Sequence, residues 1–251
     1  MRFVSILKRL KQMLKKLSLI ALVTALLLAE APKKQNIDDV FYENDIKTAP
    51  NAKPIFVRDT DSALGRYNLY PKELDIKTLA RAHGHLCDGL VLAYVELSNT
   101  LPKLFSDGVI DRTDIRVVAK NSPCLVDTSA LMSGARINHK TLSLDNSLGG
   151  SFIVQRISTG KTYKVSLRDK SFLTALKSKE KEIKTKQKEH KKVTSKDIDE
   201  VEALAFEAMR HMLRTDPKKL LKITELKGYK YHFNIDDIGS RSDVKNKNVA
   251  R

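Results

Sequence analysis

Apolar side chains recur at helical spacing on both sides of a short break near residue 85. Before the break, residues 72–82 are predicted to form a helix. The apolar face of this helix carries Leu74, Leu79 and Ala82. After the break, a second predicted helix starts close to Cys87 and ends at the Leu101-Pro102 pair. Its apolar positions are Leu90, Val91, Ala93, Tyr94 and Leu97. Residues 83–89 therefore lie between two helices.

Farther along the chain, alternation of apolar and polar positions indicates strands. We expect strands at residues 114–119, 141–144, 151–157 and 161–167. The last two flank Ser158-Thr159-Gly160, which predicts a hairpin. A short helix with Leu125, Leu131 and Met132 is expected to end at Gly134. This pattern predicts an α+β fold, with helices packed on a mostly antiparallel sheet in a single core domain at residues 71–168.

The segment before the core shows no sustained periodicity. Residues 32–70 are expected to be an irregular N-terminal arm. Two short apolar groups, at residues 40–42 and 55–57, are expected to pack this arm onto the core.

After the core, the pattern predicts a helical extension. Residues 169–195 are rich in lysine and indicate an exposed helix or a linker. Residues 196–238 combine a helix with one apolar face, a short capped helix and a closing strand of the core. Residues 239–251 are polar and are expected to form a flexible tail.

The N-terminus has the three parts of an export signal. A basic region precedes an apolar run at residues 17–28, and Ala29-Glu30-Ala31 then supplies the small-x-small pattern of a cleavage site. The run is shorter than the roughly 20 residues of a membrane-spanning helix. Residues 1–31 therefore predict an exported, for example periplasmic, protein. The alternative is an uncleaved N-terminal membrane anchor, the one part of the chain expected to touch a membrane.

Charge modifies this picture only slightly. The net charge is +16, and lysines concentrate at residues 177–192. The chain has no Trp, and its basic stretch lacks interleaved aromatic residues, so a specific nucleic-acid site is not expected. We interpret the stretch as the solvated face of a helix. A homodimer is left open.

The chemistry concentrates in Arg81-Ala-His-Gly-His-Leu-Cys-Asp-Gly89. His83, His85 and Cys87 offer two imidazoles and a thiol, which are donors for zinc and other transition metals. Cys124 repeats the situation of Cys87, since each thiol stands at the start of a predicted helix. A helix N-terminus favours the thiolate, which binds metal or attacks an electrophile. The four side chains are candidate metal ligands.

Other interpretations of the same residues remain open at this point. Two nearby histidines are often no more than polar residues at a helix end, and a cysteine before an apolar run is often a small buried residue. The chain has two cysteines, so an exported protein could join them in a disulfide.

The motif resembles the signature of the FmdE family, named after the E chain of formylmethanofuran dehydrogenase. His83-Gly-His-Leu-Cys-Asp-Gly89 is similar to that family's His-Gly-His-x-Cys-Pro-Gly, with Asp88 in place of proline. Cys124-Leu-Val-Asp127 matches a Cys-x-x-Asp block, and Pro217 to Ile223 is similar to the closing segment. The resemblance covers residues 74–168 and 197–226. This sequence lacks the C-terminal zinc-finger cysteines that many members of the family have.

The resemblance implies an α+β core with a cavity lined by cysteines and histidines. The expected ligands of a transition metal ion, zinc above all, or of a metal-containing cofactor are His83, His85, Cys87 and Cys124. Asp127 and His139 are expected to orient ligands from outside. An accessory or carrier role is favoured over catalysis. The alternatives are a metal- or thiol-dependent enzyme acting on a small molecule, and a disulfide-stapled interaction domain.

Overall fold

The computed structural model describes residues 41–62, 65–68 and 70–235. The predicted export signal and the tail at 239–251 lie outside the described residues, as does Val40 of the expected arm. Within the described ranges, no helix combines the length and apolar character needed to cross a membrane. Helices and two mixed sheets give the α+β class that the sequence predicts.

The larger sheet has five strands in the order β5-β4-β6-β7-β8. Its strands are β4 (Ile115–Ala119), β5 (Leu142–Leu144), β6 (Phe152–Arg156), β7 (Thr162–Leu167) and β8 (Leu221–Glu225). β4 runs parallel to β5, and the other neighbouring strands are antiparallel. The hairpin of β6 and β7 is confirmed, with Gly160 in the left-handed turn at φ 70°. The sheet is therefore mostly antiparallel, as expected.

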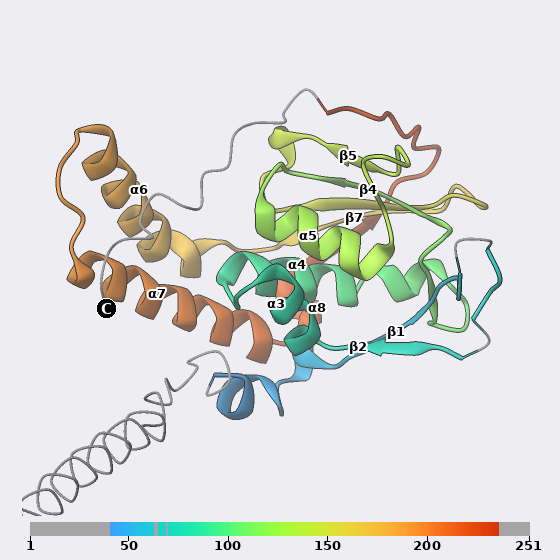
Figure 1. Cartoon of the computed structure of the whole chain (residues 1–251), viewed down its shortest axis with the longest axis horizontal. Coiled ribbons are helices and arrows are strands. Elements are labelled where there is room, and N and C mark those ends of the chain that lie inside the picture. The colour runs from blue at the N-terminus through green and yellow to red at the C-terminus, as the bar shows by residue number, and fades with distance from the viewer. Residues whose placement is uncertain (1–40, 63–64, 69, 236–251) are drawn as a thin grey trace, which may run out of the picture. The chain divides into compact units, whose positions relative to one another are not determined.

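Helix α4 (Asp88–Ser98) is the most buried helix of the fold. It packs against α5 (Pro123–Ser133), α7 (Ser195–Arg214) and strand β7, and α5 packs on β4 (Figure 1). Helix α5 follows Ser122 at the N-cap position and has Pro123 in its first turn. Gly134 ends it in the left-handed conformation, as predicted. The two helices that begin at the cysteines thus lie side by side against the sheet.

The smaller sheet corrects two predictions. It has the order β2-β1-β3, from β1 (Ile55–Arg58), β2 (Lys72–Leu74) and β3 (Ile110–Asp111). The arm is therefore not irregular throughout, and the helix expected from residue 72 begins only at Ile76, as α3 (Ile76–His83). Asp75 sets this start, because its side chain accepts a hydrogen bond from the Thr78 N–H at 2.7 Å.

Strands β1 and β2 were missed because they are short and pair with distant partners. Ile55 pairs with Leu74, and Val57 pairs with Lys72 on one side and Ile110 on the other. The arm packs on the core as expected, since Phe41, Ile55 and Val57 are buried, while Phe56 points outward and is 47% exposed. The described residues from Phe41 to Ile235 belong to one compact unit.

Short helical turns connect the larger elements. They span Tyr42–Ile46, Pro50–Ala52, Leu101–Leu104, Asn146–Leu148 and Ser171–Leu173. The C-terminal extension is helical, with α6 (Thr174–Lys188), α7 and the four-residue α8 (Pro217–Leu220). β8 then adds to β7, as predicted for the closing strand. α6 is packed on the rest of the protein and is not a flexible linker, because its Leu176 and Ile183 side chains are buried.

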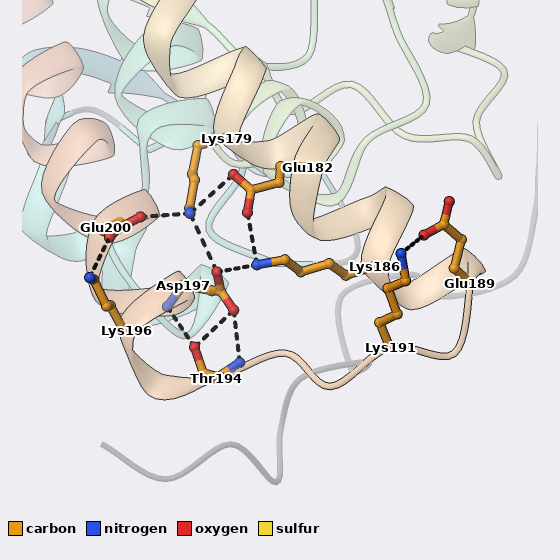
Figure 2. Close-up of polar contacts among 9 residues, drawn as sticks. All are labelled: Lys179, Glu182, Lys186, Glu189, Lys191, Thr194, Lys196, Asp197 and Glu200. Carbon is orange, nitrogen blue, oxygen red and sulfur yellow. Dashed lines mark hydrogen bonds and ion pairs between the residues drawn. The ribbon is translucent and has the colours of Figure 1, made fainter.

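Ion pairs join α6 to the start of α7 (Figure 2). Asp197 lies between Lys186, at 2.5 Å, and Lys179, at 3.4 Å. The same carboxylate closes a capping box with Thr194 at the first turn of α7. These hydrogen bonds, with that from Lys186 foremost, hold the pKa of Asp197 well below its usual range. Two lysines of the lysine-rich stretch, Lys179 and Lys186, are thereby paired with an acidic group.

Replacing Asp197 with Asn is expected to destabilise the α6–α7 hairpin at neutral pH. Because the folded pKa of Asp197 is lowered, its contribution is present above the unfolded pKa of about 3.9 and is lost as pH falls toward the folded pKa. The difference in unfolding free energy between wild type and Asp197→Asn should therefore shrink below about pH 4. Urea denaturation at several pH values measures it. Glu189→Gln, which removes the exposed pair with Lys191, is the control expected to show no such difference.

Candidate metal centre

The end of α3 and the start of α4 present three donor side chains. His83 is the last residue of α3, and Gly84 follows in the left-handed region at φ 108°. A residue with a Cβ rarely adopts this conformation, which turns the chain sharply toward Cys87, the N-cap of α4. One nitrogen each of His83 and His85 and the Cys87 sulfur lie within 4.8 Å of one another. A short break between helices thus gathers three donors.

Cys124 brings a fourth donor from a distant part of the chain. It lies in the first turn of α5, and its Sγ atom is 3.3 Å from Sγ of Cys87. This approach depends on Gly89, because a Cβ at that position would stand 2.9 Å from Cβ of Cys124. The expected meeting of the two cysteines is observed, and both thiols are free.

The sulfur separation bears on both proposed uses of the pair. A disulfide requires an S–S distance of about 2.05 Å. Two thiolates on one tetrahedral zinc, each about 2.3 Å from the metal, stand about 3.8 Å apart. The observed 3.3 Å lies closer to the second value. Adjustments of a few tenths of an ångström would accommodate a shared metal ion.

His83 is oriented as a metal-binding histidine would be. Its Nδ1 is 2.8 Å from Oδ2 of Asp127, and its side chain is 4% exposed. The other ring nitrogen, Nε2, is buried and has no hydrogen-bond partner among the described residues. A carboxylate on one nitrogen fixes the tautomer and leaves the other nitrogen to accept a metal. The residues present therefore fit a metal ion.

The electrostatics favour one thiolate in the pair. The hydrogen bond from Cys87 and the neighbouring His83 lower the pKa of Cys124 to about 7, against the opposing effect of burial. The hydrogen bond to Cys124, together with burial, raises the pKa of Cys87. Burial lowers the pKa of His83, but Asp127 and Cys124 outweigh it, so the net shift is upward. In the metal-free site Cys124 is therefore the thiol that ionises first, and its thiolate accepts a hydrogen bond from the Cys87 thiol.

Thiol reactivity should reveal this asymmetry. In the metal-free protein, the iodoacetamide reaction rate of Cys124 is expected to reach half of its maximum near pH 7, compared with about 8.5 for an ordinary cysteine. Cys87 and His83 both lower the pKa of Cys124. Cys87→Ser and His83→Ala should therefore each move the midpoint to higher pH. Peptide mass spectrometry of the alkylated protein assigns the rate to each cysteine. Equal midpoints for both thiols would contradict the asymmetry.

The remaining histidines lie apart from this group. His139 is exposed in the turn after α5 and is not among the three side chains grouped as metal donors in the described part of the chain. His211, to which the sequence assigns no role, stacks on Phe172 with ring centroids 4.1 Å apart. His85, by contrast, lies with its ring centroid 4.7 Å from that of His83.

Two further residues of α4, Gly89 and Glu96, have properties that the motif alone does not predict. Gly89 permits the contact between α4 and α5, which a glycine in the first turn of an apolar helix could have suggested. Glu96 is an acidic residue within the apolar run of α4, and its side chain is fully buried. An acidic residue within that apolar run is the sequence signal that could have pointed to a buried carboxyl group.

Comparison with a family model agrees with the motif. A search of curated proteins finds no match. Among solved structures, the chain is similar to a tungsten formylmethanofuran dehydrogenase FmdE-like protein from Syntrophus aciditrophicus, at 12% identity and a TM-score of 0.40. That match covers 61% of this chain and 73% of the other. Residues 82–222, more than half of the chain, match the family described as "FmdE, Molybdenum formylmethanofuran dehydrogenase operon". The chain therefore belongs to the FmdE family.

Proposed function

We propose that this protein is an exported FmdE-family domain that binds a transition metal ion, zinc in particular, in an accessory or carrier role. The observation that carries the proposal is the buried Nε2 of His83, which has no hydrogen-bond partner among the described residues. Asp127 holds the same ring in place, and the donors of His85 and Cys87 lie within 4.8 Å of it.

The donor set supports zinc over harder metals. Two imidazoles and thiolate sulfur suit zinc, whereas magnesium and calcium prefer oxygen ligands. Cys124 is not part of the group whose donors all lie within 4.8 Å, but its sulfur is 3.3 Å from that of Cys87 and would supply a fourth ligand. Such a set favours a closed site over a catalytic one, which keeps a position open.

Metal content tests the proposal directly. The full chain, purified without added chelator, is expected to carry about one zinc per chain by inductively coupled plasma mass spectrometry. Cobalt substitution should add thiolate-to-cobalt charge-transfer absorption, which reports sulfur ligation. A protein that binds neither metal stoichiometrically, with both thiols titratable, would contradict the metal proposal. Loss of both titratable thiols without reductant would instead identify the disulfide-stapled form.

A specific contact favours one second candidate, thiol-dependent chemistry on a small molecule. His83 lies between Asp127, to which it is hydrogen-bonded at 2.8 Å, and Cys124, whose pKa is lowered. This is the arrangement of a Cys-His-Asp catalytic triad. In that role His83 would act as the base, and Asp127 would orient it. A metal-free protein that forms a covalent adduct with an activated thioester at Cys124, and loses it in His83→Ala, would support this candidate.

Export rests on residues 1–31 and is tested separately. Fractionation of the producing cells, followed by N-terminal sequencing, should find the mature protein outside the cytosol, beginning after Ala31. Full-length protein in the cytosol would refute export. Membrane-bound protein that retains residues 17–28 would support the anchor instead.

A further inference from the structure

A separate pocket opens beside the cysteine pair. It has a volume of about 350 Å³ and is bounded by α4, the loop at Gly149 and Gly150, and the start of α6. This size lies within the range of small-molecule sites. Its apolar wall consists of Leu92, Leu125, Leu167, Leu173 and Leu176.

The feature that points to a ligand is Glu96. Its side chain is fully buried, yet it lines the pocket, and neither carboxyl oxygen has a hydrogen-bond partner of normal geometry among the described residues, the nearby Leu167 backbone included. Such a group is costly to bury without a partner, and folded proteins rarely leave one. Burial raises the pKa of Glu96 well above its ordinary value, against the smaller lowering effects of Lys170 and the Leu167 backbone. Burial therefore favours the protonated form of Glu96, which can both donate and accept a hydrogen bond.

The rim of the pocket is basic. Lys120 precedes α5, Lys170 lies just before α6 and Lys177 is in the first turn of α6, and all three are exposed. Two carboxyl groups oppose them, those of Glu180 and Asp88. Burial and the charge of Glu180 raise the pKa of Asp88. Three ammonium groups thus face two carboxyl groups. The balance of charge at the rim is therefore positive.

An internal ion pair does not explain Glu96. Among the described residues, no ion pair joins Glu96 to Lys170, although Lys170 contributes to the same pocket. The pocket thus combines a hydrogen-bonding group at its inner end, an apolar wall and ammonium groups at its mouth. Each of these features suits a different part of one molecule.

We propose that this pocket binds a small organic anion with an apolar body. Its carboxylate or phosphate lies among Lys120, Lys170 and Lys177, and its distal hydroxyl or carbonyl group bonds to Glu96. The pocket does not depend on the metal. Gly89 and Ser122, which also line it, adjoin the cysteine-bearing helix starts, so the anion would lie next to any bound metal.

Calorimetric titration of the full chain with simple probes tests this site. 6-Hydroxyhexanoate and 6-hydroxyhexyl phosphate supply the anion, the apolar body and the hydroxyl, and the stronger binder identifies the anion class. Hexanoate lacks the hydroxyl, and 1,6-hexanediol lacks the charge. We expect saturable binding of at least one hydroxylated anion, weaker binding of hexanoate and none of the diol.

Matched variants assign the contacts. Lys120→Met and Lys170→Met should each weaken anion binding about tenfold, as loss of one charge-assisted hydrogen bond predicts. Lys188→Met, on α6 but outside the pocket, should leave it unchanged. Glu96→Leu should abolish the preference for 6-hydroxyhexanoate over hexanoate, whereas Glu96→Gln should keep it, because an amide also donates and accepts.

Metal content, measured on the same samples, keeps this inference distinct from the proposed function. The lysine variants should retain their metal, and anion binding by a protein without metal would leave the pocket assignment intact. The assignment is overturned if neither hydroxylated anion binds saturably at millimolar concentration. It is also overturned if the diol binds equally well, or if Lys188→Met weakens binding as much as Lys170→Met does.

Discussion

Cys87→Ser and Cys124→Ser are each expected to lose most of the metal bound by the wild-type protein. Their Sγ atoms lie 3.3 Å apart at the starts of α4 and α5, so removal of either sulfur leaves the proposed site with one thiolate. A hydroxyl is a poor replacement, because it stays protonated at neutral pH. Affinity should fall more than about a hundredfold, measured by competition with a chromophoric zinc chelator.

Single substitutions of the other candidate ligands and of their neighbours should lower metal affinity to different degrees. His83→Ala and His85→Ala should also lose metal, since each removes a nitrogen from the group within 4.8 Å. Asp127→Ala should weaken binding roughly 10- to 100-fold, the usual cost of removing a carboxylate that orients a ligating histidine. His139→Ala tests the expected outer role of that exposed residue. His232→Ala, at an exposed position outside the motif, is the control. Undiminished metal in the double cysteine variant would show that the site is elsewhere.

Gly134→Ala is expected to destabilise the fold by roughly 3 kcal/mol or more. Gly134 ends α5 at φ 74°, where a Cβ would stand 2.2 Å from the backbone oxygen of Arg112. Backbone cannot move aside as a flexible side chain can, so the strain of the left-handed conformation adds to a steric clash. Urea denaturation of the metal-free protein at neutral pH measures the loss.

Gly160→Ala is the matched control for this substitution. Gly160 has a similar φ of 70°, in the hairpin turn between β6 and β7, but an added Cβ would meet no described atom within 4 Å. It should therefore cost only about 1 kcal/mol, the strain of the left-handed conformation by itself. Similar losses in the two variants would show that the clash with Arg112 is relieved at little cost.

Elements whose cause lies within a few residues could be predicted from the sequence. The β6–β7 hairpin follows from alternation around Ser158-Thr159-Gly160, and α7 follows from its one apolar face. α5 follows from Pro123 at its start and Gly134 at its end. In each case the signal and the structure occupy the same short stretch. The α+β class follows from their order.

Elements that depend on distant partners could not be placed in the same way. β1 and β2 have four and three residues, too few to show a period, and each is stabilised by pairing with the other or with β3. Leu74 fits the apolar face of a helix as well as an edge strand, so residues 72–74 were assigned to the wrong element. The cap at Asp75, which settles the matter, became evident only from its hydrogen bond to Thr78.

The candidate metal centre was likewise predictable from the sequence only in part. The sequence by itself determined which side chains could bind metal, and it placed His83, His85 and Cys87 at one break between helices. Only the tertiary structure decided that Cys124 reaches Cys87, that Asp127 holds His83, and that Glu96 is buried beside a pocket. Donor chemistry belongs to individual residues. The distances between these side chains, their burial and their pKa values are set only when segments 37 or 44 residues apart in the sequence pack together. Gly89 allows the closest of these approaches.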